Sequence, residues 1–277
     1  MPSPDHLEMT LLPGGRELLA VHARELPQRD DLCGAFCGAL ALRAAGVAEH
    51  GGAPLDQDEV ALAAGSVVAG ARAAGVLPHG EPGRRDYRLS LPSIDDPDLS
   101  GTTAAGLLEA IVHLGAGALV ATPYTGPWTT STLAGLFDVG CACERPVTLV
   151  ANLATRHLWG GHASISQLLA YLFDGELDGP EPDWDVGHFA CVVARVQGPA
   201  GSLYAVADTY PTLGDGGVHM QPQERLATAL ERRDMPAGGM IVVVSAEDAA
   251  AVRAGADALG LREGLWDNGT ATGETAR

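Results

Sequence analysis

The chain has 277 residues, and 46% of them are apolar, which is enough for one large domain with a sizeable core. Its formal net charge of −18 argues against a nucleic acid or an anionic membrane surface as partner, because both are bound through basic patches. Five cysteines without the spacing of a disulfide framework, no basic and apolar leader, and no apolar run long enough to cross a membrane together predict a cytoplasmic protein.

Helices are expected first along the chain and strands later. Apolar periodicity predicts helices over residues 15–26, 33–46, 56–76, 102–114 and 129–139. Residues 77–100 hold four prolines and are expected to form a loop. Apolar, β-rich runs predict strands over residues 118–121, 146–150, 188–194, 203–208 and 240–244, and a helix follows over 246–258. This order indicates an α+β fold.

The most informative segment runs from Gln28 to Leu42, where a polar loop leads directly into an apolar helix that begins at Cys33. A thiol at a helix N-terminus meets unpaired N–H groups and the positive end of the helix dipole, and both favour the nucleophilic thiolate. The amide of Gln28 is a candidate donor to an oxyanion beside that thiol.

A histidine and an aspartate occur where a hairpin would place them side by side. His188 begins one predicted strand, Asp208 ends the next, and the link over residues 198–202 is rich in turn-forming residues. Asp208 would then orient the imidazole of His188 and leave its other nitrogen for the thiol.

The combination of Gln28, Cys33 and Gly34 at a helix start resembles papain-like cysteine peptidases, and within them the C39-like domains most closely. Residues 145–150 resemble the Pro-Val strand of that family, 187–189 its His strand and 206–208 its Asp strand. The resemblance implies a papain-like fold, with an N-terminal helical half packed on a C-terminal antiparallel β-sheet. It places a single domain over residues 1–262 and leaves 263–277 as a polar, disordered tail.

The sequence departs from the family between the Pro-Val strand and the His strand, where residues from about 153 to 187 form an insertion. A helix is expected over 164–173, followed by an acidic, proline-rich stretch. Of the insertion, His157, Trp159 and Trp184 are expected to border the substrate site, together with Gly34 and Gly187. The competing interpretation is an excursion that packs on the far side of the molecule.

The remaining cysteines suggest no second chemistry. Cys37 follows Cys33 by one helical turn and is expected to pack in the core, with a redox role as the alternative. The spacing of Cys141 and Cys143 is poor for a structural zinc site, so neither metal nor cofactor is expected.

Four residues define the predicted chemistry: Cys33, His188, Asp208 and Gln28. They would break a peptide, amide or thioester bond through a thioester on Cys33, acting on a small molecule or a peptide. Water as acceptor gives a peptidase or amidase. The alternatives are an acyltransferase or amide synthase on the same scaffold and, in another class, a catalytically silent binding protein.

Overall fold

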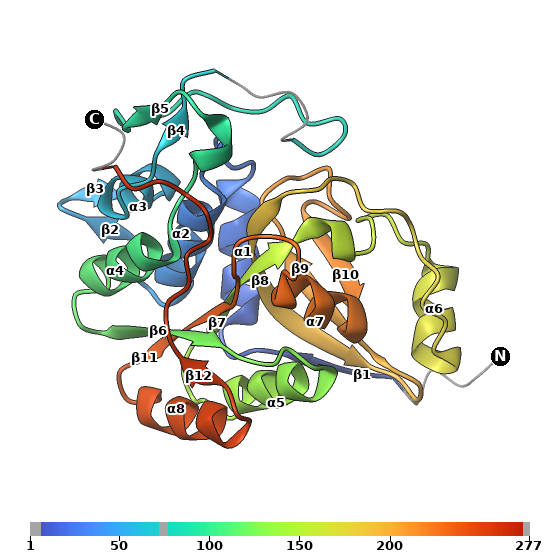
Figure 1. Cartoon of the computed structure of the whole chain (residues 1–277). Helices are drawn as coiled ribbons and strands as arrows, with labels where there is room; N and C mark the ends of the chain where they lie inside the picture. The colour runs from blue at the N-terminus through green and yellow to red at the C-terminus, as the bar shows by residue number, and fades with distance from the viewer. Residues whose placement is uncertain (1–6, 72–76, 274–277) are drawn as a thin grey trace.

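An antiparallel sheet of eight strands runs through the centre of the molecule (Figure 1). The computed structural model describes residues 7–71 and 77–273. The strands are β1 (Glu8–Leu11), β6 (Leu119–Thr125), β7 (Thr148–Ala154), β8 (Gly187–Gln197), β9 (Ser202–Ala207), β10 (Val218–Pro222), β11 (Met240–Ser245) and β12 (Arg262–Glu263). Their order is β10-β9-β8-β7-β11-β6-β12, and β1 pairs with the second half of β8.

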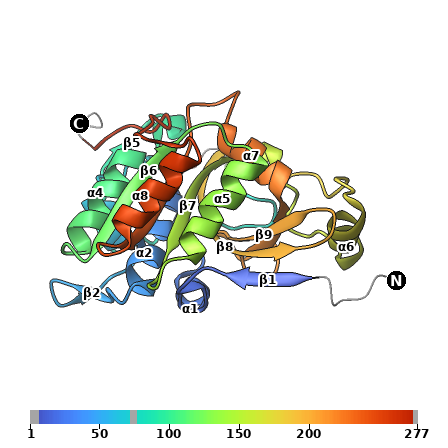
Figure 2. The ribbon, with the colours of Figure 1, turned by 90° about the horizontal axis from the view of Figure 1, so that it is seen from below.

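Helices cover both faces of this sheet. On one face lie α1 (Gly15–Glu25), α2 (Cys33–Ala44), α3 (Gln57–Ala63) and α4 (Ala104–Leu114), and on the other α5 (Thr130–Cys141), α7 (Gln223–Glu231) and α8 (Ala249–Ala258). In β8, Phe189 and Cys191 face the first layer while Ala190 and Val192 face the second, as the pleat of a strand requires. Figures 1 and 2 show α5 and α8 side by side on the second face.

The helix that begins at Cys33 is the central element of the first layer. Ten of the twelve residues of α2 are buried, which is why the helix is apolar on all sides rather than on one stripe. Gly38 permits close packing, because a Cβ there would lie 2.8 Å from side-chain atoms of both Leu107 and Val60. The helix thus has little freedom to move its N-terminal end.

Short elements lie between the longer helices and strands. Two pairs of two-residue strands are present: β2 (Glu49–His50) pairs with β3 (Ala53–Pro54), and β4 (Val68–Ala69) pairs with β5 (Ser93–Ile94). Two short 3-10 helices are η2 (Pro97–Leu99) and η3 (Thr155–His157).

The predicted helix over residues 56–76 is wrong beyond Ala63. Gly65 has a φ of 62° and ends the helix, and Val68 continues as strand. Residues 72–76 lie outside the described residues.

The insertion between β7 and β8 does contain its predicted helix, α6 (Ile165–Asp174), with Ser164 and Gln167 forming a capping box.

The segment expected to be a disordered tail, residues 263–277, instead packs on the molecule over 263–273. Trp266 is buried against the first layer, and the side chain of Asn268 donates to the carbonyl of Thr102 at 3.1 Å. Residues 274–277 lie outside the described part of the chain.

The α+β class predicted from the sequence is confirmed. None of the helices formed by the described residues is long and apolar enough to cross a membrane.

Candidate active site

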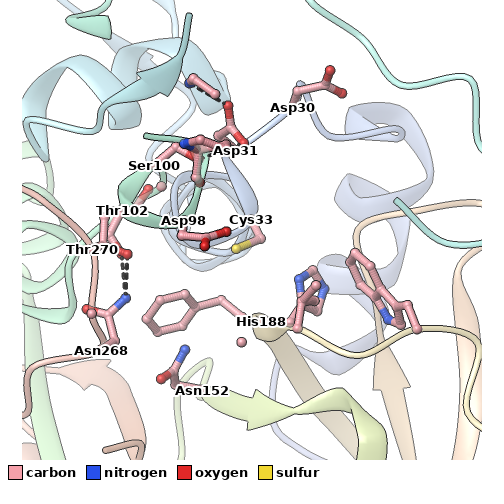
Figure 3. Close-up of a pocket in the computed structure, with 18 of the residues that line it drawn as sticks. Asp30, Asp31, Cys33, Asp98, Ser100, Thr102, Asn152, His188, Asn268 and Thr270 are labelled. Carbon is pink, nitrogen blue, oxygen red and sulfur yellow. Dashed lines mark hydrogen bonds between the residues drawn. The ribbon is translucent and has the colours of Figure 1, made fainter. Parts of the chain in front are cut away.

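A pocket of about 480 Å³ opens where the N-terminus of α2 meets the ends of β7 and β8 (Figure 3). Its walls come from the loop before α2, the residues before β8, the segment after α7 and the C-terminal segment after β12. Figure 3 shows Cys33 and His188 around one cavity, with Asp31 and Asp98 on the side of Cys33 and Asn152 on the opposite side.

Cys33 is the first residue of α2 and is half-buried. The residue before the helix, Leu32, provides no side-chain cap, so the N–H groups of the first turn remain available to the pocket. Asp31 fixes this corner with a φ of 68°, and its carboxylate accepts from the N–H of Ala69 at 2.9 Å and the hydroxyl of Ser100 at 3.0 Å. The thiol is therefore placed at the positive end of a helix whose preceding corner is held by hydrogen bonds.

His188 and Asp208 form the pair that the hairpin predicted. His188 Nε2 lies 2.8 Å from Asp208 Oδ1, and both side chains are buried. The turn between β8 and β9 is closed by Gly198 N–H donating to Gly201 O at 2.9 Å. Because Nε2 is engaged with the carboxylate, Nδ1 is the ring nitrogen left for the thiol.

Charge couples these groups. Burial lowers the pKa of His188, but the Asp208 carboxylate and the neighbouring Cys33 outweigh this effect and raise the pKa to about 10. Burial raises the pKa of Asp208, and the two histidines that contact it, His188 and His219, hold that pKa well below its usual range. The site therefore favours an imidazolium on an ionised carboxylate, next to the thiol.

A second histidine steadies the same carboxylate. His219 Nε2 lies 3.0 Å from Asp208 Oδ2, and Gln221 Nε2 donates to His219 Nδ1 at 2.8 Å. With Nδ1 as acceptor, His219 must carry its proton on Nε2 and donate it to Asp208. The other amide atom of Gln221 accepts from Trp159 N–H at 2.7 Å. Asp208 is thus fixed through a chain of hydrogen bonds that reaches the insertion.

Gln28, the predicted oxyanion donor, lines the same pocket as Cys33 and His188. Only 4% of its surface is exposed, and its backbone N–H donates to Thr209 O at 2.9 Å, next to Asp208. Its side-chain Oε1 is buried and has no hydrogen-bond partner among the described residues. The unpaired oxygen is an acceptor, so it is the amide Nε2 of Gln28 that could donate to an oxyanion.

Of the residues predicted to border the substrate, the structure brings Trp184 and Gly187 to the pocket but not His157, Trp159 or Gly34. Trp184 packs against the His188 ring, with centroids 4.8 Å apart. Trp159 is instead buried with 3% exposed in a separate apolar cluster with Tyr171. The large aromatic side chain of Trp159 therefore completes the core between α6 and β9 and does not line the pocket.

The other cysteines lie away from the pocket. Cys37 and Cys191 are fully buried neighbours in the first layer, and burial, with Cys191 beside it, raises the pKa of Cys37 well above its usual value. Burial also raises the pKa of Cys141, and that of Cys143 to about 11. Within the residues that the structure describes, no three His, Cys, Asp or Glu side chains are grouped to hold a metal ion.

Among the contributions to the pocket that the sequence did not predict are Arg232 after α7, Asn152 in β7 and residues 268–270 after β12. The residues around Arg232 are typical of a solvent-exposed helix end. Asn152 lies in an apolar strand and belongs to no recognisable motif. Of these residues, only Asn152 carried a signal, because a polar side chain in a buried, mostly apolar strand often faces a site.

The geometry defines an α+β protein in which a cysteine and a histidine share one pocket and a buried aspartate contacts the histidine. The chain belongs to a family of unknown function (DUF6885), whose profile matches residues 12–267 and so includes all of these side chains. A search of the curated proteins finds no match to the chain.

Proposed function

We propose that this pocket is the active site of a papain-like cysteine enzyme that transfers an acyl group through a thioester on Cys33. The observation that carries the proposal is that Cys33, at the start of α2, shares its pocket with His188, whose Nε2 is held 2.8 Å from Asp208. A thiol, an imidazole and a carboxylate so arranged supply nucleophile, base and orienting group.

The positions along the chain support the papain-like assignment. The oxyanion donor precedes the helix, the cysteine begins it, the histidine begins a strand, and the aspartate ends the adjacent antiparallel strand, as in C39-like domains. The layer formed by α5, α7 and α8 goes beyond the arrangement of one helical half on one sheet that the resemblance implies.

In the first step, the Cys33 sulfur attacks the carbonyl carbon and forms a C–S bond, while the bond to the leaving amine or thiol breaks. The proton of the thiol passes through Nδ1 of His188 to the leaving group. The side chain of Gln28 and the first N–H groups of α2 are placed to stabilise the oxyanion of the tetrahedral intermediate.

In the second step, an acceptor attacks the thioester and its proton returns through His188 to Cys33. Water gives hydrolysis of a peptide, amide or thioester, and an amine gives amide synthesis. Neither step requires a metal or a cofactor.

Selective alkylation tests the proposal. Iodoacetamide at neutral pH should modify Cys33 much faster than Cys141 and Cys143, which are also half-buried and serve as internal controls. His188→Ala should reduce the rate at Cys33 alone. Equal rates at the three thiols would favour the catalytically silent binding protein and contradict the proposal. Peptide mass spectrometry resolves each site.

A further inference from the structure

Two arginines that the proposed chemistry does not use line the pocket, the exposed Arg85 and the buried Arg232. Arg232 lines the pocket with 3% of its surface exposed, and no carboxylate in the described part of the chain pairs with it. A buried guanidinium without a counter-ion is rare, because desolvation of the charge is uncompensated. The chain has 35 acidic residues against 17 basic ones, so carboxylates are not scarce.

The fold holds this guanidinium in one position. Arg232 ends α7 with a left-handed φ of 45°, and Gly187 and Gly238 leave the room it occupies: a Cβ on Gly187 would lie 2.7 Å from Nη2. Its Nη1 donates to Asn152 Oδ1, which also accepts from Trp266 Nε1 at 3.3 Å. An arginine fixed on one side by an amide is preorganised rather than mobile.

The rest of the guanidinium has no acceptor in the described part of the chain. Nε is buried and unpaired, and none of the described residues accepts from Nη2. Because Nε is covered by protein and Nη2 is not fully buried, Nη2 is the group left to donate a charge-assisted hydrogen bond to a ligand in the pocket. Gly187, against which Nη2 lies, directly precedes His188.

We propose that Arg232 binds a carboxylate of the substrate close to the carbonyl that Cys33 attacks. This inference rests on the proposed function and names the substrate class: an acyl compound that carries a carboxylate near the reacting group. The wall opposite Asn152 carries Asp31 and Asp98, whose carboxylates repel an anionic group, whereas Arg232 is bonded to Asn152 (Figure 3). This asymmetry would fix the orientation of the substrate.

The charge state suits this role. Burial lowers the pKa of Arg232 to about 10, against an opposing effect of Cys33. The side chain therefore remains cationic at neutral pH, in the pocket that it shares with Cys33.

Two alkylating reagents that differ only in charge provide the test. Anionic iodoacetate and neutral iodoacetamide are compared at Cys33, and the ratio of their rate constants is the readout. Any change in thiolate content affects both reagents equally and cancels in the ratio. The net negative charge of the protein repels iodoacetate but not iodoacetamide. The ratio of the two rate constants at Cys141 corrects for this repulsion.

Wild-type protein should show a corrected ratio about tenfold above that of Arg232→Gln, as expected for one charge-assisted contact. Arg232→Lys should retain part of the preference. Asn152→Asp, an isosteric change, should also abolish it, because the new carboxylate neutralises Arg232 without removing it. An unchanged ratio in Arg232→Gln and Asn152→Asp would overturn the proposal.

A binding experiment tests the role of Arg232 independently of the reactivity of Cys33. In a Cys33→Ala background, saturation-transfer NMR with benzoate, benzamide and phenyl phosphate should show benzoate binding that Arg232→Gln removes and weak benzamide binding that it leaves. Benzoate binding that survives Arg232→Gln, or a preference for phenyl phosphate, would overturn the carboxylate assignment. An unreactive Cys33 together with Arg232-dependent benzoate binding would refute the proposed function and retain the anion site.

Discussion

Asp208 is the residue on which the arrangement of the site depends. One oxygen faces His188 and the other faces His219, and His22 Nε2 lies 2.5 Å from its backbone carbonyl oxygen. Three histidines from α1, β8 and β10 therefore converge on one residue at the end of β9. A buried network of this kind is rigid when every member is satisfied, so the imidazole of His188 is held in a single orientation.

Asp208→Asn should reduce turnover by about 10²- to 10⁴-fold, because an amide neither fixes the tautomer of His188 nor stabilises its charge. His219→Gln is the matched comparison: it removes the other side-chain contact of Asp208 and should cost far less turnover. Steady-state kinetics and thermal unfolding of both variants check this. Equal losses would mean that Asp208 holds the loop rather than the imidazole.

The stability of the protein should also depend on His188 at alkaline pH. Its pKa is raised from about 6.5 in the unfolded chain to about 10 in the folded one. The contribution to the free energy of unfolding is therefore complete below about pH 6.5 and is lost as the pH rises through about 10.

Denaturation between pH 7 and 10 should show a decline in the free energy of unfolding that is weaker in His188→Gln. A surface control, His162→Gln, should keep the wild-type slope, because that side chain is exposed. Parallel curves for the wild type and His188→Gln would contradict the coupling to Asp208.

At the residue scale, the sequence predicted those site residues whose placement depends on their neighbours along the chain. Cys33 follows from a polar loop that meets an apolar helix, and the pairing of His188 with Asp208 follows from a hairpin with a turn-rich link. Arg232 and Asn152 could not be found in this way. Their contact joins residues 80 apart, and it exists only because the sheet and α7 have already packed together.

Among the elements, α2 determines where the thiol lies. Its first turn packs so closely that a Cβ on Gly34 would lie 2.9 Å from Thr102 Cβ and 3.2 Å from Phe189 Cδ2. One turn later, Gly38 is equally crowded by α3 and α4. The two glycines offer matched substitutions, one at the site and one away from it.

Gly34→Ala and Gly38→Ala should each lower the free energy of unfolding by about 1–3 kcal/mol, as overpacking does. Only Gly34→Ala should also slow alkylation of Cys33, because it displaces the turn that carries the thiol. Chemical denaturation and alkylation rates measure the two effects. If Gly38→Ala slows alkylation as much, the site depends on the whole helix rather than on its first turn.

The insertion between β7 and β8 divides into a structural part and a part that reaches the site. Trp159 packs under α6, whereas Trp184, on the return limb, packs on His188 and, with ring centroids 5.6 Å apart, on Tyr210. Sequence reasoning gave both tryptophans one role, because neither composition nor spacing distinguishes an aromatic in a small core from one beside a pocket.

Trp159→Ala should cost about 3–5 kcal/mol of stability, as for a buried aromatic, with KM nearly unchanged in the fraction that stays folded. Trp184→Ala should cost less stability and lower kcat, because it opens the His188–Asp208 pair to water. Thermal unfolding and kinetics on both variants separate the roles. A raised KM in Trp159→Ala would restore the substrate-contact interpretation.

Elements that depend on distant partners were the ones that the sequence did not predict. β10 is short and contains polar His219 and Gln221, and it forms because β9 offers an edge with which it pairs from Val218 to Pro222. The segment over 263–273 is polar except near Trp266, and its order comes from contacts with the first layer. Local propensity contains neither kind of information.

For the molecule as a whole, the C-terminal segment closes the pocket that the two halves of the chain create. After β12 it crosses back to the helical layer (Figure 1), where Asn268 Oδ1 accepts from Ala104 N–H at 3.2 Å and Ala271 N–H donates to Leu99 O at 2.8 Å. Gly269 and Thr270 line the pocket. These residues follow position 267, where the family profile ends, so the wall they form lies outside the part shared with the family.

Removal of residues 268–277 should therefore widen the pocket while leaving Cys33, His188 and Asp208 in place. A bulky maleimide should modify Cys33 faster in the shortened chain than in the full chain, whereas iodoacetamide, which already fits, should react at a similar rate. Asn268→Ala, which loses the hydrogen bonds but keeps the chain, should give an intermediate maleimide rate. A parallel loss of reactivity toward both reagents would show instead that the segment supports the fold around α4 and that the pocket owes its size to the helical layer alone.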